Sequence, residues 1–431
     1  MLTAFGRAFK TPDLRRKLLF TLAMIGIYRL GSLVPGPGVS YVAIQRCIDQ
    51  TKDSTLYGLI NLFSGGALLQ LSVFALGIMP YITSSIIVQL LVVVIPRLET
   101  LKAEGQSGQA KLTQYTRYLT IALAVLQSTG IVALAKSNRL FPSCNEQIIP
   151  DQSIFRILVL VVTLTAGTSV IMWLGELVTD RGIGNGMSVL IFTSIISSMP
   201  AQALRIFRQP NGAFVLLAIA LLAMIVITLV IFVEQAQRRV PVQYAKRMIG
   251  RRAYGGTSTY IPLKVNQAGV IPVIFASSLL YLPQLLANVW SSNTAFSTFT
   301  TRYLSSGDHP IYLCLYFGLI VFFTYFYVAI TFNPVEVSDN MKKYGGFVPG
   351  IRPGRATAEY LDYILSRITA FGAVYLGAVA VLPYLLFSLT GGANRLPFGG
   401  TAVLIIVGVG LETVKQIESQ LMLRNYEGFL R

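Results

Sequence analysis

Ten apolar stretches, each long enough to cross a lipid bilayer as a helix, constrain this chain more than any other feature. A helix needs about 20 apolar residues to cross a hydrocarbon layer about 30 Å thick. Because these runs lack the alternation of barrel strands, only helices can satisfy the backbone inside lipid. We predict an all-α integral membrane protein with ten transmembrane helices. The stretches cover residues 18–34, 74–95, 118–135, 155–176, 187–204, 213–233, 268–288, 311–332, 369–389 and 401–420.

Positive charge is concentrated in alternate connections between these stretches. Most of the 35 Lys and Arg lie near the N-terminus, in the even-numbered connections and in the C-terminal tail. An excess of Lys and Arg marks the cytoplasmic side, so we expect both termini in the cytoplasm. The net charge of +17 indicates an anionic lipid or other anionic partner at that face, and no DNA-binding fold.

The residues that enzymes and ion-coupled pumps use are scarce in the spans. Arg29 lies towards the outer end of the first stretch, where a long side chain can snorkel to the interface. The chain has one histidine, His309, and lacks a Walker A loop. Residues 182–186, with the sequence Gly-Ile-Gly-Asn-Gly, follow an apolar stretch and predict a tight turn, not a dinucleotide site. We expect no enzyme, metal site or cofactor, and we keep a secondary transporter as the alternative function.

The sequence allows two interpretations for each of three irregular features and for one pair of cysteines. Residues 56–73 are apolar but too short and glycine-rich to cross, so they form either an interfacial helix or a re-entrant segment. Isoleucines at i, i+4 spacing share a helix face, which predicts packing or lipid contact and does not by itself indicate a pore. The long basic connections 234–266 and 333–366 either set the topology or bind an anionic partner. Cys47 and Cys144 lie on outer loops, and the sequence does not decide whether they pair.

Four segments resemble signatures of the SecY family, the pore subunits of the general protein-secretion channel. They are residues 74–91 (FALGIMPYITSSIIVQLL), 173–188 (WLGELVTDRGIGNGMS), 262–272 (PLKVNQAGVIP) and 347–354 (FVPGIRPG). The resemblance implies a passive, gated, protein-conducting channel. It would carry secretory preproteins across the membrane and release membrane proteins laterally into it, driven by a partner motor or the ribosome.

The resemblance also implies an architecture and site residues. Two pseudo-symmetric inverted halves of five helices would cover 1–209 and 210–431, with a short re-entrant plug helix in 56–73. The plug core would be Asn61, Leu62, Phe63, Ser64, Gly65, Gly66, Ala67, Leu68 and Leu69. The apolar pore ring would be Ile82, Ile86, Ile191, Ile195, Ile274 and Ile405. Thr83 and Gln127 would be polar residues of the lateral gate, and Arg251, Arg252, Arg352 and Arg355 would bind a partner.

Partners and location follow from the same resemblance. The family implies the small subunits SecE and SecG, the SecA ATPase, the ribosome and preprotein signal sequences as partners. It implies a multi-pass protein of the bacterial inner (plasma) membrane, with a plastid thylakoid membrane as the alternative.

Overall fold

The computed structural model describes residues 11–50, 64–136, 146–151, 153–208, 212–244, 247–249, 252–254, 258–289, 294–304, 309–390 and 400–427. The first half of the chain forms α2 (Pro12–Leu33), α3 (Tyr41–Gln50), α5 (Met79–Val94), α6 (Pro96–Ala103), α7 (Gln106–Lys136), α8 (Ile154–Arg181) and α9 (Gly186–Phe207). The second half forms α10 (Gly212–Gln235), α11 (Ile271–Val289), α12 (Thr294–Phe299), the π-helix η1 (Thr300–Leu304), α13 (Pro310–Thr331), α14 (Pro334–Lys343), α15 (Arg355–Thr390) and α16 (Gly400–Glu427). The strands are β1 (Gln237–Tyr244), β2 (Arg247–Ile249), β3 (Arg252–Tyr254), β4 (Ser258–Lys264) and β5 (Gly346–Phe347).

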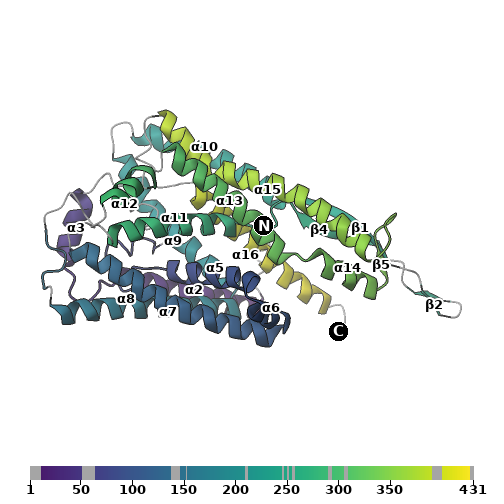
Figure 1. The fold of residues 1–431 in the computed structure, drawn as a ribbon. Helices are drawn as coiled ribbons and strands as arrows, with labels where there is room; N and C mark the ends of the chain where they lie inside the picture. Colours follow the sequence, from purple (N-terminus) through teal and green to yellow (C-terminus); the bar gives the residue numbers. More distant parts are fainter. Residues whose placement is uncertain are drawn as a thin grey trace.

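Long helices running roughly along one direction dominate the molecule (Figure 1). Each predicted apolar stretch coincides with one of α2, α5, α7, α8, α9, α10, α11, α13, α15 and α16. Among the described residues, five helices are long and apolar enough to cross a membrane, or six if the bent pair α5–α6 is one span. The helical, membrane-type fold is therefore confirmed, and the crossing of all ten stretches stays a prediction.

The second predicted stretch, 74–95, was placed too early. Residues 74–78 form turns, and α5 begins only at Met79 because Gly77 adopts a φ of 58°. The helix ends at Val94, because the next residue, Ile95, precedes Pro96 and takes an extended conformation. A residue before proline is disfavoured in the helical region, and the chain turns by 100° into α6 at this point.

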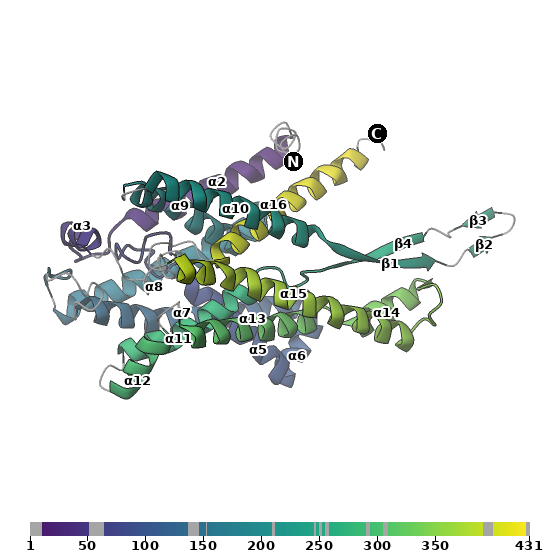
Figure 2. The same ribbon diagram turned by 90° about the horizontal axis from the view of Figure 1, so that it is seen from above.

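Described parts of the two long basic connections pair with each other. Strands β1 and β4 form an antiparallel ribbon that extends away from the helices, and the paired strands β2 and β3 lie beyond it (Figure 2). The second connection, expected to be a loop over 333–366, instead contains α14, β5 and the start of α15. Strand β5 pairs with β1, and apolar residues of both connections share one buried cluster. We call the end of the molecule that carries this ribbon the ribbon end.

Both ends of the described chain lie at the ribbon end. Leu14 at the start of α2 packs with Ile183, between α8 and α9, and with Ile417, late in α16. Figure 2 shows α16 running towards the side on which the ribbon projects. A chain that crosses the membrane an even number of times has both ends on the same side, as found here.

The main apolar core joins the two halves of the chain. Its buried members come from α2, α5, α8 and α9 on one side and from α10, α11, α13, α15 and α16 on the other. A second cluster lies within the first half and includes Ile44, Leu71 and Leu164. In the described residues, apolar side chains of both halves therefore pack in one core.

Candidate functional site

The six predicted ring isoleucines are buried in the core that joins the halves. Their exposed fractions lie between 0% and 7%, and all six belong to the same buried cluster. Two helices of each half supply them: Ile82 and Ile86 on α5, Ile191 and Ile195 on α9, Ile274 on α11 and Ile405 on α16. None of the six faces lipid, which removes the lipid-contact interpretation of their i, i+4 spacing.

The Gly-Asn-Gly turn sets the position of the α9 pair. Asn185 begins the helix because its Oδ1 accepts hydrogen bonds from the backbone N–H groups of Met187 and Ser188, at 3.1 and 3.4 Å. Gly184 has a φ of 88°, and a Cβ on Gly186 would lie 1.9 Å from the carbonyl oxygen of Gly175. The predicted tight turn is therefore confirmed, and glycine is required there by conformation and close packing.

The described part of the predicted plug is folded into the protein. Ser64, Ala67, Leu68 and Leu71 are each at most 2% exposed, and Gly36 and Leu71 are joined by a backbone hydrogen bond. For residues 64–72 the surface-lying alternative is wrong. A helix over 65–69 is also wrong, since these residues form turns with φ of 64° at Gly65 and 95° at Gly66. Asn61, Leu62 and Phe63 lie outside the described residues.

The predicted gate residues are buried on helices that contact the other half. Helix α11 of the second half packs against α5, α7 and α13. Thr83 of α5 and Gln127 of α7 are 5% and 4% exposed. The hydroxyl of Thr83 donates to the carbonyl oxygen of Met79 within its own helix, at 2.9 Å. At the ribbon end of the same interface, Lys102 Nζ of α6 donates to the carbonyl oxygen of Ile330 at 3.3 Å, which joins α6 to the end of α13.

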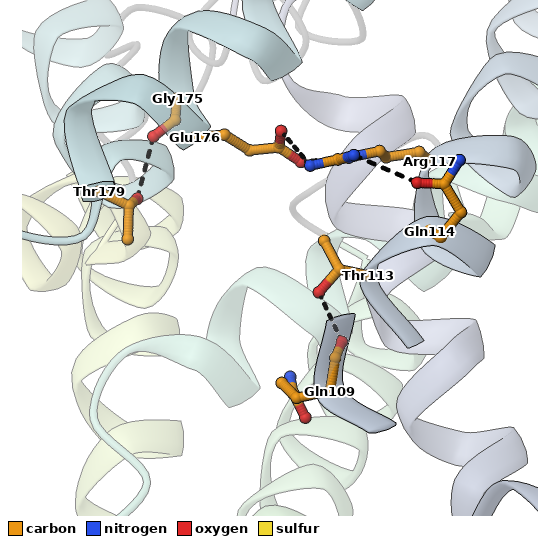
Figure 3. A network of polar contacts seen from close by, with 7 residues as sticks. All are labelled: Gln109, Thr113, Gln114, Arg117, Gly175, Glu176 and Thr179. Atoms are coloured by element: carbon orange, nitrogen blue, oxygen red, sulfur yellow. Dashed lines mark hydrogen bonds and ion pairs between the residues drawn. The ribbon is translucent and has the colours of Figure 1, made fainter. Parts of the chain in front are cut away.

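An ion pair joins α7 to α8. Arg117 Nε and Nη2 donate to the two carboxylate oxygens of Glu176, at 2.9 and 2.8 Å, and Arg117 Nη1 donates to Gln114 at 3.2 Å (Figure 3). Paired donors that match a carboxylate in this way are stronger than single contacts. Thr179, also on α8, accepts a hydrogen bond from the N–H of Gly186. Polar side-chain contacts thus join α8 both to α7 and to the turn before α9.

Of the four predicted docking arginines, the structure describes the side chains of Arg352 and Arg355. Arg352 and Arg355 are exposed beside α14 and the start of α15, and Arg355 pairs with Glu359 at 2.9 Å. The backbone of Arg252 lies in the β2–β3 hairpin, and Arg251 lies outside the described residues. Sequence reasoning missed Arg239, whose guanidinium lies 4.8 Å from the ring centroid of Tyr260 across the ribbon. The signal that could have found it is the basic pair Arg238-Arg239 on a connection that also carries Tyr260.

The structure shows whether two of the three cysteines are bonded. Cys47 of α3 is disulfide-bonded and buried, and Cys314 of α13 is free and exposed. Cys144, whose pairing the sequence leaves open, lies outside the described residues.

Comparison with known proteins decides the family. The SecY family model matches residues 72–414, which include the six isoleucines, Thr83, Gln127 and the two long connections. The chain belongs to the SecY family. A protein translocase subunit SecY of Streptomyces scabiei is 64% identical over 437 residues, with 100% of both chains covered. This SecY-family chain is therefore a protein-conducting channel subunit, and the secondary-transporter alternative is set aside.

Solved structures agree with this fold. A SecY protein whose plug domain is described as stabilising the closed state of its translocation channel superposes with a TM-score of 0.64 at 19% identity. The match covers 94% of this chain and 91% of that one. Sec61 in the canine ribosome–channel complex superposes with a TM-score of 0.57 at 16% identity and covers 94% and 91%. At such identities these likenesses concern the fold, and this SecY-family chain shares it.

Proposed function

We propose that an extended polypeptide passes between the halves 1–209 and 210–431, through a ring made by the six isoleucines. The observation that carries this proposal is their common burial in one apolar cluster to which four helices, two from each half, contribute. The two halves would be inverted repeats of five membrane-spanning helices each.

An apolar ring suits a channel that must exclude water and ions at rest and widen around a passing polypeptide. A narrow apolar constriction disfavours water and ions by dewetting, whereas aliphatic side chains can change rotamer around a passing chain. The segment at 64–72 acts as the plug below this ring, within the longer region 56–73. Its burial among α2, α9 and the second apolar cluster supports a resting state in which it blocks the outer side.

The lateral gate lies between α5 and α7 on one side and α11 and α13 on the other. Thr83 and Gln127 are among the buried polar residues of these helices. A signal sequence or a membrane-protein helix would enter this interface and leave towards lipid. Separation of α11 from α5 and α7 would then open the route sideways.

The ribbon end is the cytoplasmic docking face. The exposed Arg352 and Arg355, the hairpin that carries Arg252 and the stacked Arg239 offer positive charge on two connections that are packed together. A ribosome or the SecA ATPase would bind there, as the ribosome-bound canine channel suggests by its fold. SecE and SecG would complete the membrane complex, and anionic lipid would surround its basic rim.

Orientation and location follow from the charge. With the ribbon end in the cytoplasm, both termini are cytoplasmic, as the positive-inside rule requires. The bacterial relative favours the inner (plasma) membrane over a thylakoid membrane.

A site-specific photo-crosslinking experiment tests the route. A photoreactive amino acid would replace Ile274 or, as a control on the same helix, Leu279, which is 42% exposed on the outside of α11. In the assembled channel with an arrested preprotein, we expect crosslinks from position 274 to the preprotein and from position 279 to lipid. Preprotein crosslinks of equal yield from both positions, or from neither, would contradict the proposed path.

A further inference from the structure

Arg29 is half-buried and is bonded within the protein. It is the charged residue in the apolar part of α2, and its Nη1 donates a hydrogen bond to the carbonyl oxygen of Gly65 at 3.1 Å. The sequence gives this side chain a place near the outer end of its helix, and the structure gives it a partner there. A charge within a membrane span is costly and marks a functional position by default, and here its partner is the backbone of the segment proposed as the plug.

Gly65 packs closely between α2 and α9 at this contact. A Cβ on this residue would lie 3.0 Å from Arg29 Nη1, 3.2 Å from the Cα of Ser194 and 3.2 Å from Ser197 Oγ. Its φ of 64° turns the carbonyl into a direction that other residues rarely adopt. The segment therefore passes between α2 and α9 at the level of Ser194, one residue before the ring residue Ile195.

The two helices that flank Gly65 are joined independently of it. The hydroxyls of Tyr28 and Ser194 lie 2.6 Å apart and share a hydrogen bond, and Tyr28 is 1% exposed. The ring of Tyr28 also stacks on Phe74, with 6.1 Å between centroids. Arg29 thus extends from a helix whose position against α9 is already set, and its guanidinium can hold Gly65 without having to hold the helices.

We propose that Arg29 positions the plug: its hydrogen bond to Gly65 holds the segment against α9 and keeps the resting channel sealed. This inference depends on the proposed function of residues 64–72 as the plug. Passage of a polypeptide would replace the bond, since the carbonyl and the guanidinium can both turn to the moving chain. One hydrogen bond to a charged group corresponds to roughly a tenfold change in an equilibrium constant.

The test is the resting ion conductance of the complete channel complex in planar bilayers, without preprotein. We expect Arg29→Gln to raise the conductance roughly tenfold, in line with the loss of one charge-assisted bond. We expect Arg29→Lys, which keeps a cationic donor, to restore most of the seal. Gly65→Ala should also leak, because a side chain there would displace the segment.

Two matched variants separate gating from folding. Tyr28→Phe removes the hydrogen bond between α2 and α9 and leaves the Arg29 contact intact, and Arg46→Gln removes an exposed arginine on α3 that pairs with Glu146. Both should remain sealed, whatever they do to the melting temperature. A sealed Arg29→Gln channel, or a Tyr28→Phe channel that leaks equally, would overturn the role of Arg29.

A replacement of residues 64–70 by a Gly-Ser linker distinguishes failure of this inference from failure of the plug. If that channel leaks and Arg29→Gln does not, the segment is the plug and Arg29 does not position it. If neither leaks while both assemble and melt as the unmodified complex does, the segment is not the plug and both proposals fail.

Discussion

Asn266 and Glu234 join the end of α10 to the start of α11 at the base of the ribbon. The Asn266 Nδ2 group donates to Glu234 Oε1 and, at 3.1 Å, to the carbonyl oxygen of Gly269. Asn266 is 3% exposed. The chain enters the ribbon just after Glu234 and leaves it just before Asn266. The bond between them therefore closes the base of the ribbon beside α11, the helix that carries Ile274.

The first prediction concerns this connection. Asn266→Ala would leave a half-buried carboxylate without its amide donor, so we expect stability to fall by about 2 kcal/mol. We also expect partner-driven translocation to fall further than the stability loss explains, on the hypothesis that this bond couples the ribbon to α11. Thermal unfolding and preprotein uptake into vesicles measure the two effects. The Glu234→Gln variant keeps an acceptor oxygen and should retain most activity; a loss equal to that of Asn266→Ala would contradict the prediction.

The second prediction concerns Arg117 and Glu176. Their side chains are 41% and 20% exposed, so screening reduces the value of the pair, and we expect a coupling energy of about 1 kcal/mol in a double-mutant cycle. Arg117→Lys should lose most of it, since lysine cannot form the paired contact. The single contact Lys111–Glu104, at 3.9 Å and more exposed, is the control and should give a coupling near zero. Equal coupling in both cycles would show that the paired geometry adds nothing.

The third prediction concerns the ring. Ile405 is 0% exposed, and Ile405→Asn would place an amide in an apolar constriction, lowering stability by about 2 kcal/mol. We expect water to enter the ring, the resting ion leak to rise several-fold and selection for signal sequences to loosen. Planar-bilayer conductance and export of a preprotein with a defective signal sequence measure these effects. Ile405→Leu keeps the apolar surface and should remain sealed, and a sealed Ile405→Asn channel would argue against the ring.

The fourth prediction concerns the ribbon end. Arg352 is exposed, and Arg352→Glu would place a negative charge where an anionic partner is proposed to bind. We expect motor- or ribosome-coupled transport to fall while membrane insertion is unchanged. Each charge contact to ribosomal RNA that is lost should also reduce the salt dependence of binding by about one counterion. Arg355→Glu is a weaker change, because Arg355 is already paired with Glu359. Unaltered transport and salt dependence in Arg352→Glu would exclude this residue from the docking face.

Local sequence determined where helices and turns lie. Apolar runs of spanning length predict α7, α8, α10 and α13 because hydropathy and helical periodicity act within one segment. The turn at 182–186 follows from glycine and asparagine chemistry in the same way. The start of α5 and the helical content of 333–366 were missed, because proline and glycine positions and inter-loop packing decide them.

Family resemblance, and not spacing, selected the six ring isoleucines. The i, i+4 pattern of Ile82 with Ile86 and of Ile191 with Ile195 is equally typical of a packed or lipid-facing helix. Only the tertiary structure brings these residues together with Ile274 and Ile405, from helices far apart in the chain.

Tertiary structure alone decided the hydrogen-bond partner of Arg29. From the sequence, a charge near the end of an apolar stretch is expected to reach the interface. Its acceptor, the carbonyl of Gly65, becomes available only because residues 64–72 fold back between α2 and α9. That arrangement is fixed by contacts such as Tyr28 with Ser194, 166 residues apart. Hydropathy and helix propensity are properties of neighbouring residues, whereas the partner of a buried charge depends on which distant segments pack beside it.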